Sequence, residues 1–277
     1  MKKFFWRSVI LIFLLSGASA VNASDFRARL SSQLSQKRNL DDIRAEISFG
    51  RDVAARILGT IPLVRDEALT LYLNRIGVAL AASANRPDLA FHFALLDSDT
   101  VNAFAAPGGY VFVTRGALKL MADEAELAAV LAHEIAHVAS RHIVNELRIR
   151  SQDTTGMSLT SLIVGSSDPV RLALQQMVDQ AVNILFKRGY KQQDEFESDR
   201  IGTMLLVFSG YDPTALKRYL RKIPTLESQS TKDLSRTHPP LSQRIAKIET
   251  FARQNEFFRL KQGTLHQERF ESYVRSH

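Results

Sequence analysis

Two histidines and a glutamate lie close together in the segment AAVLAHEIAHVAS, residues 128–140. His133 and His137 are four residues apart, so in a helix their imidazole rings project from one face, with Glu134 beside them. Burying such groups among alanine, valine and leucine is unfavourable unless they bind a partner. This His-Glu-x-x-His pattern predicts a zinc site, in which two imidazoles hold the metal and the glutamate takes a proton from the attacking water. A solvated histidine pair, the alternative reading of the spacing, is disfavoured by the apolar neighbours.

A catalytic zinc ion needs a third protein ligand and one open position. The segment DEFESDRIG supplies carboxylates: Glu195 and Asp199 are four residues apart and share a helical face. We expect Glu195 to bind the metal and Asp199 to accept a hydrogen bond from the outer N–H of a ligand histidine. Glu197 points to the opposite face and is the weaker candidate. His142 does not fit a known ligand spacing, so we expect a polar surface residue there.

Helices are predicted to carry most of these residues, because apolar residues recur at three- and four-residue spacing. Asp123 and Glu126 form a predicted N-terminal cap for the metal-binding helix, which we expect to continue to about Arg148. The segment LAFHFALLDS alternates like a strand, and NAFAAPGGYVFVT predicts two strands joined by a Pro-Gly-Gly turn, the second at Tyr110–Thr114. Further helical segments are expected at 30–84, 170–186, 194–210 and 241–257. A Ser/Thr/Gly-rich loop is expected at 151–168.

The composition is that of one globular domain. The chain has 277 residues, 45% of them hydrophobic, and no cysteine. Disulfides, thiol catalysis and cysteine-bound zinc are therefore excluded. The formal net charge is +7, and it falls to +4 without Lys2, Lys3 and Arg7 of the N-terminal leader. This charge is too small to indicate a nucleic-acid partner.

The leader MKKFFWRSVILIFLLSGASAVNA has the basic start, apolar run and small-residue end of a secretory signal peptide. Its apolar run is shorter than the ~20 residues needed to span a bilayer, which disfavours an uncleaved membrane anchor. We therefore expect a cleaved signal peptide at residues 1–23 and a single domain at 24–277. An exported chain without cysteine suits a bacterial periplasm.

An ordered set of motifs resembles the zinc metallopeptidase family that includes the CAAX prenyl endoprotease, HtpX and the periplasmic BepA type. The motifs are NAFAAPGGYVFVTRGAL, LAHEIAHVASRH, DEFESDRIG, SGYDP and THPPLSQRI, in that order over about residues 40–250. The resemblance implies an α+β fold: a mainly helical, zincin-like (gluzincin) domain with a small antiparallel sheet whose edge strand lines the active site. Ser198 stands where the family usually has alanine. We expect neither the transmembrane helices nor the C-terminal helical repeats found in some members.

By this resemblance, GGYVFVT is the edge strand on which an extended peptide pairs through main-chain hydrogen bonds. The substrate-binding residues would then be Gly109, Tyr110, Val111 and Phe112. An amphipathic strand without this role would have the same sequence pattern.

The resemblance also assigns roles around one Zn²⁺ per chain. Glu195 becomes the third ligand, beside the two histidines of the helix motif. His238 in THPPLSQRI lies over the metal, and Arg244 faces the substrate carbonyl oxygen. Glu134 would take a proton from the attacking water and return it to the leaving amine, while His238 or Arg244 stabilises the oxyanion. Whether His238 also closes the metal site in the resting enzyme stays open.

The expected function is therefore that of an exported zinc metalloendopeptidase in envelope protein quality control. Its expected substrates are unfolded or misassembled envelope polypeptides, with a peripheral contact to the membrane or to the outer-membrane assembly machinery as a further expectation. The alternative is a chaperone-like binder of unfolded envelope proteins with weak or latent protease activity. A structural zinc protein is disfavoured, because three protein ligands leave one position open.

Overall fold

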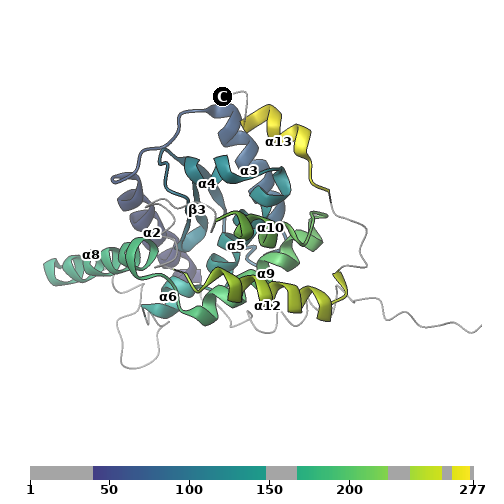
Figure 1. The fold of residues 1–277 in the computed structure, drawn as a ribbon. Helices are drawn as coiled ribbons and strands as arrows, with labels where there is room; N and C mark the ends of the chain where they lie inside the picture. The colour runs from purple at the N-terminus through teal and green to yellow at the C-terminus, as the bar shows by residue number, and fades with distance from the viewer. Residues whose placement is uncertain (1–39, 148–166, 224–237, 258–263, 275–277) are drawn as a thin grey trace, which may run out of the picture.

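The computed structural model describes four ranges of the chain (Figure 1), which are residues 40–147, 167–223, 238–257 and 264–274. The predicted signal peptide and nearly all of the loop predicted at 151–168 lie outside these ranges. Within them, no helix combines the length and the apolar character needed to cross a membrane.

The first half of the described chain contains the sheet and the central helix. Its elements are α2 (Leu40–Leu58), α3 (Glu67–Ala81), β1 (His92–Leu96), β2 (Ala103–Ala106), the 3₁₀ turn η1 (Pro107–Gly109), β3 (Tyr110–Thr114), α4 (Arg115–Leu120), α5 (Glu124–Ala139) and α6 (His142–Glu146). The second half is helical. Its elements are α8 (Asp168–Asn183), the π-helical turn η2 (Ile184–Arg188), α9 (Gln192–Phe208), α10 (Ala215–Lys222), α12 (Leu241–Gln254) and α13 (Gln267–Val274).

The central helix α5 begins where the sequence predicts. The Asp123 side chain accepts a hydrogen bond from the backbone N–H of Glu126 at 3.0 Å, which satisfies a donor that the first helical turn leaves free. Glu126 in turn accepts from the backbone N–H of Ala122 at 2.9 Å. Every residue of α5 is buried, so the helix lies inside the domain and its polar residues need internal partners.

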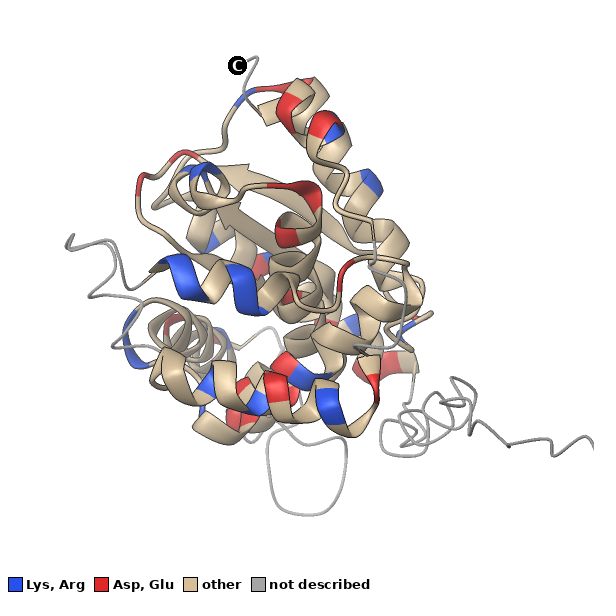
Figure 2. Ribbon diagram, turned by 45° about the vertical axis from the view of Figure 1, so that its right-hand side comes forward, with Lys and Arg blue, Asp and Glu red and all other residues tan. Residues whose placement is uncertain are grey.

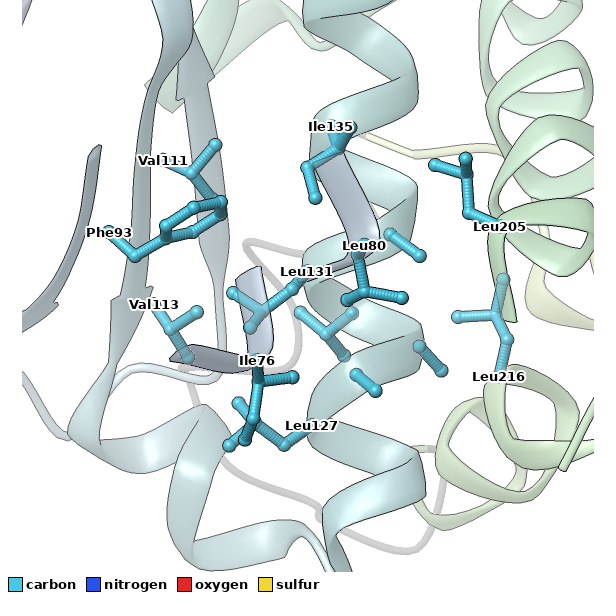
Figure 3. Packing of buried hydrophobic residues seen from close by; sticks show 14 of the residues in the cluster. Ile76, Leu80, Phe93, Val111, Val113, Leu127, Leu131, Ile135, Leu205 and Leu216 are labelled. Atoms are coloured by element: carbon cyan, nitrogen blue, oxygen red, sulfur yellow. The ribbon is translucent and has the colours of Figure 1, made fainter. Parts of the chain in front are cut away.

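Core side chains pack against α5 from two opposite sides (Figure 3). Leucine and isoleucine side chains of α5 lie between the sheet on one side and α9 and α10 on the other, and residues of α3 pack in the same cluster. Fully burying one such side chain contributes about 1.5–3 kcal/mol. The labelled core residues are Ile76, Leu80, Phe93, Val111, Val113, Leu127, Leu131, Ile135, Leu205 and Leu216.

The mainly helical α+β fold is confirmed, but the sheet is mixed and not wholly antiparallel. Its strand order is β1-β3-β2, with β1 parallel to β3 and β2 antiparallel to it. The prediction that Tyr110–Thr114 forms the edge strand is therefore wrong, because β3 is central. The hydrogen-bonding groups of β3 pair with a neighbouring strand on each side, and β2 is the edge strand that contacts α5.

A glycine allows α9 to lie directly against α5. A Cβ atom added at Gly202 would lie 3.0 Å from the backbone nitrogen of His133 and 3.2 Å from the carbonyl carbon of Ala132. Real Cβ atoms rarely approach other atoms so closely, so a larger residue would push the two helices apart. The absence of a side chain here brings Glu195 and Asp199, on the same helix, alongside the histidines of α5.

Charged residues of both signs are interspersed along the helices (Figure 2). A second group of charged residues is buried, on α5 and on other segments of the domain, where each charge needs a partner. The buried charged residues are Asp42, Glu46, Arg86, Asp123, Glu124, Glu126, Glu134, Glu195, Asp199 and Arg244.

The C-terminal end of α5 differs from the sequence prediction of a helix to Arg148. The helix ends at Ala139, and Arg141 adopts the left-handed conformation with φ 57° before α6 begins. Glu46 of α2 holds this turn, with Oε2 2.9 Å from Nε of Arg141 and Oε1 3.1 Å from Nη1 of Arg86. Arg86 also donates to the carbonyl oxygen of Val138 at 3.2 Å. The break thus depends on residues far away in the sequence.

The N-terminal end of α5 is tied to α13, a helix that the sequence analysis did not predict. The Glu124 carboxylate accepts hydrogen bonds from the hydroxyls of Tyr72 at 2.9 Å and Tyr211 at 2.6 Å, and it pairs with the guanidinium of Arg269 on α13. Tyr273 of α13 stacks on Tyr72 with ring centroids 4.4 Å apart. Burial would raise the pKa of Glu124, but the hydrogen bonds from Arg269 and the two tyrosines lower it below its ordinary value.

We predict that Glu124→Gln lowers the free energy of unfolding at pH 7 by about 1–3 kcal/mol. The neutral amide cannot form the ion pair with Arg269 or accept all the hydrogen bonds that the buried carboxylate accepts. A folded-state pKa below the unfolded one means that ionised Glu124 stabilises the fold above its ordinary pKa of 4.5. This stabilisation is lost as the pH falls through the folded-state pKa, so the deficit of the variant should shrink in acid. Urea unfolding at about pH 7 and pH 4 measures it, with exposed Glu268→Gln as the control. A deficit that grows in acid would contradict the assignment.

Candidate metal centre

Three side chains from α5 and α9 converge within the domain. The Nε2 atoms of His133 and His137 are 3.1 Å apart, and the Glu195 carboxylate lies 3.7 Å from the first and 3.6 Å from the second. One nitrogen or oxygen of each residue lies within 4.8 Å of the others, and all three side chains are buried. We call this group the ligand triad. The described residues contain no other such cluster.

The donor set of the ligand triad fits zinc. Neither carboxylate oxygen of Glu195 has a hydrogen-bond partner within the described part of the chain, although Nη1 of Arg244 lies 3.2 Å from Oε2. Burial raises the pKa of Glu195 to about 8 against the opposing charge of Arg244. A cation between these groups would satisfy the orphaned oxygens, and two imidazoles with one carboxylate are a common catalytic zinc set.

Asp199 lies where the sequence analysis expects it, one helical turn after Glu195. Its Oδ1 atom is 3.0 Å from Nδ1 of His133, so it accepts the outer N–H of this ring and leaves Nε2 directed into the ligand triad. Burial would raise the pKa of Asp199, but the charge of Arg244 and hydrogen bonds from His133 and Arg244 hold it well below its ordinary value.

By the family resemblance, Arg244 was expected to face a substrate carbonyl oxygen. Its guanidinium contacts two carboxylates, and its side chain also lines the cavity shared by Glu134 and His238. Nε and Nη2 lie 2.9 and 2.6 Å from the two oxygens of Asp199, and Nη1 lies beside Glu195. The side chain is 4% exposed. In this arrangement Arg244 holds Asp199, which in turn holds His133.

Glu134 is buried beside the ligand triad but is not part of it. Burial raises the pKa of its carboxyl to about 8, against the opposing charge of Arg244. Glu134, His238, Asn102 and Ala103 line a cavity of about 40 Å³. The cavity therefore joins a candidate proton acceptor to the edge of the sheet.

His238 reaches the ligand triad from the loop before α12. Its Nε2 atom lies 3.7 Å from Oε1 of Glu195, and its side chain is 14% exposed. His238 is thus close enough to approach a metal ion or a substrate group in the cavity. Glu197, by contrast, extends toward Ser140, with an oxygen 3.4 Å from Oγ, and does not join the ligand triad.

The strand beside the cavity is β2 and not β3, which corrects the prediction for Gly109, Tyr110, Val111 and Phe112. Gly109 lies within η1, and the other three pair with β1 and β2 through the main chain. They leave no free strand edge for a peptide.

Just before β2, the carbonyl oxygen of Asn102 accepts a hydrogen bond from the backbone N–H of Thr114 at 3.0 Å. The alternation of an antiparallel pair then directs the main-chain groups of Ala103 and Ala105 outward. The Ala103 N–H donates to the Asn102 side chain at 2.9 Å. The Ala105 carbonyl oxygen accepts from the hydroxyl of Tyr190 at 3.4 Å. Side chains of the protein itself thus cover part of this edge.

Two residues at the site were misjudged or missed in the sequence. His142 was expected on the surface, but it is buried, with Nδ1 2.9 Å from Nδ1 of His137. The left-handed turn at Arg141 redirects the chain and causes the difference. Tyr190 stacks on His137 with ring centroids 4.0 Å apart. Its only sequence signal is its place after Gly189, between two helical segments.

The sequence profile of peptidase family M48 matches residues 67–252, which include the ligand triad, Glu134 and Asp199. The chain belongs to this family. The beta-barrel assembly-enhancing protease of Escherichia coli strain K12 is 32% identical over 217 residues, which cover 76% of this chain and 45% of the relative. The mitochondrial metalloendopeptidase OMA1 of Schizosaccharomyces pombe is 30% identical over 223 residues, covering 78% of this chain and 64% of the relative.

The chain therefore spans less than two thirds of the length of these relatives. Membership of family M48 confirms the resemblance found in the motifs, and it supports a metallopeptidase with a metal, typically zinc, at the ligand triad.

We predict that Glu195→Gln weakens zinc binding by more than the roughly 10–100-fold typical of losing a partner that only orients a ligand. The amide keeps the shape of the side chain but removes the negative charge that would attract the cation bound by the two imidazoles. Glu197→Gln is the comparison on the same helix and should lower the affinity much less than Glu195→Gln, because Glu197 lies outside the ligand triad. Competition with a chromophoric chelator measures both. A larger loss for Glu197→Gln would show that the wrong carboxylate has been chosen.

Proposed function

We propose that this protein is an exported zinc-dependent endopeptidase that cleaves unfolded polypeptides. The observation that carries the proposal is a buried carboxylate, Glu134, beside a ligand triad that already contains its own carboxylate. A structural zinc site has no use for an additional buried acid that binds no metal. A hydrolase needs one as a proton acceptor.

When bound by His133, His137 and Glu195, a zinc ion would supply a positive charge that acidifies water and polarises a carbonyl oxygen. Glu134 then accepts the proton of the attacking water and later donates a proton to the leaving amine. Its raised pKa, about 8 without a cation nearby, favours the protonated form needed for the second step. The positive charge of the metal favours the ionised form needed for the first step.

The proposed substrate path follows the outer edge of β2. An extended peptide could pair with the outward main-chain groups of Ala103 and Ala105 and place a carbonyl group near Glu134. It would displace the contacts of Asn102 and Tyr190 with this edge. Pairing through the main chain accepts many sequences, so an unfolded chain is a better substrate than a folded one.

The proposed biological setting rests on the leader and on the relatives. The predicted signal peptide at 1–23 and the domain at 24–277 imply export to the periplasm, and a relative carries the name beta-barrel assembly-enhancing protease. We propose that the substrates are misassembled envelope polypeptides, met beside the membrane or its outer-membrane assembly machinery. Mass analysis of the exported protein tests this placement, since a full-length, membrane-bound form would contradict it.

The alternative is a chaperone-like protein that holds unfolded envelope chains on the β2 edge and cleaves them poorly. The hydrogen bonds on the outer edge of β2 favour this alternative as a resting state. The side chains of Asn102 and Tyr190 bind the main-chain groups with which a substrate peptide would pair. Turnover of an unfolded substrate by the zinc-loaded protein distinguishes the two functions.

We predict that Glu134→Gln retains about one zinc per chain but lowers the cleavage of casein by about 10²–10⁴-fold or more, as expected for the loss of a general base. Metal analysis and a peptide-release assay on the same preparation measure the two properties. The proposal fails if zinc is lost in proportion to activity, or if cleavage persists.

We also predict that His238→Ala increases cleavage of unfolded substrates and self-cleavage. The imidazole of His238 lies close enough to the ligand triad to occupy the position that the attacking water requires. A histidine that only stabilises the oxyanion would give the reverse result. A uniformly less active variant, with unchanged zinc coordination by X-ray absorption, would therefore contradict the gating role.

A further inference from the structure

We propose that His142 is a positioning residue for the metal site: it accepts a hydrogen bond from the outer nitrogen of His137 and so fixes this ring as a ligand. The inference rests on the proposed zinc site. It concerns a residue that belongs neither to the ligand triad nor to the groups that contact a substrate.

The geometry of the two rings determines where their protons lie. Nε2 of His137 is directed into the ligand triad, 3.6 Å from Glu195, so it must be free of a proton to bind a metal. The proton of a neutral His137 ring is then on Nδ1, which lies 2.9 Å from Nδ1 of His142. A bond between these two nitrogens requires that Nδ1 of His142 carries no proton and acts as the acceptor.

The far side of His142 agrees with this proton order. A neutral His142 that accepts at Nδ1 must carry its proton on Nε2. This atom is buried and lies 3.8 Å from an oxygen of Glu197 and 3.9 Å from an oxygen of Asp194. Both carboxylates attract a positive hydrogen on Nε2, so they favour the tautomer that His137 needs.

The two ligand histidines are therefore held by different groups. Asp199 accepts the outer N–H of His133 at 3.0 Å, and a neutral imidazole accepts that of His137. Fold features far from the metal maintain the second contact. The left-handed turn at Arg141 directs His142 back toward α5, and Glu46 pairs with Arg141 at 2.9 Å.

The test compares two replacements of His142 by zinc affinity. His142→Phe keeps a planar ring but has no acceptor, so it leaves the N–H of His137 unsatisfied and should weaken zinc binding about 10–100-fold. His142→Asn places an amide oxygen near the position of Nδ1 and should recover most of the affinity. His92→Phe, at an exposed histidine of β1, is the control for the substitution itself and should leave the affinity unchanged.

Thermal unfolding of the metal-free variants identifies a purely structural effect. If His142 only packs, Phe should be the milder replacement and zinc affinity should follow stability, which is the reverse of the order expected here. Wild-type affinity in His142→Phe, or equal losses in His142→Phe and His142→Asn, would overturn the inference. Absence of zinc binding by the unmodified protein would instead refute the proposed function, which is a separate outcome.

A second measurement needs no variant. In the zinc-loaded protein labelled with ¹⁵N-histidine, we expect His137 protonated at Nδ1, His142 protonated at Nε2, and a scalar coupling between the two Nδ1 nuclei across the hydrogen bond. Protonation of His142 at Nδ1 would overturn the inference even if His142→Phe fails to fold.

Discussion

Where Gly202 meets His133, α9 has no side chain, and an added Cβ atom would lie 3.0 Å from the α5 backbone. This contact determines the position of the third ligand, because Glu195 and Asp199 lie two turns and one turn earlier on the same helix. Their carboxylates must reach nitrogens that are fixed on a completely buried helix. A small displacement of α9 would separate the ligand triad and also remove Asp199 from His133. Interiors packed at this density transmit such a displacement and do not absorb it.

Electrostatics at the site follow from the same packing. Glu195, Asp199 and Glu134 are buried close together, and Arg244 is a basic residue that contacts the first two directly. Its planar guanidinium binds both oxygens of Asp199 at 2.9 and 2.6 Å, a geometry that lysine could not reproduce. Arg244 therefore compensates charge and orients Asp199, while its side chain also lines the cavity beside Glu134 and His238. Burial raises the pKa values of Glu134 and Glu195 to about 8, because Arg244 alone does not balance the negative charge of the site. A divalent cation would supply the missing positive charge.

The features that the sequence predicts are those with a local signal. The Asp123 cap, the strand Tyr110–Thr114 and the shared helical face of His133 and His137 each depend on residue spacing within a short segment, and the structure agrees with all three. The pairing of Glu195 with these histidines was predicted from the family resemblance of its motif, and the structure brings the three together. The features that it misses depend on contacts between distant segments. Strand order cannot be read from alternation, so β3 was taken for an edge although β1 pairs with it in parallel. The position of His142 depends on the left-handed backbone conformation of Arg141. Arginine rarely adopts this conformation, so the sequence does not predict it.

Glu46 belongs to α2, which precedes the segment that matches family M48. It is the shared counter-ion of Arg86 and Arg141, and the Arg86 side chain has no solvent exposure. A shorter version of the domain that begins at residue 67, where the family match starts, would therefore lack Glu46 but keep Arg86 and Arg141. The side chain of Arg86 would remain buried. Asp88 would still pair with Arg86 at 2.8 Å, but the Nη1 group of Arg86 and the guanidinium of Arg141 would both lose the carboxylate that they share. Neither guanidinium can discharge by losing a proton. A piece of this protein that keeps these ion pairs therefore begins with α2, ahead of the first residue that the family profile matches.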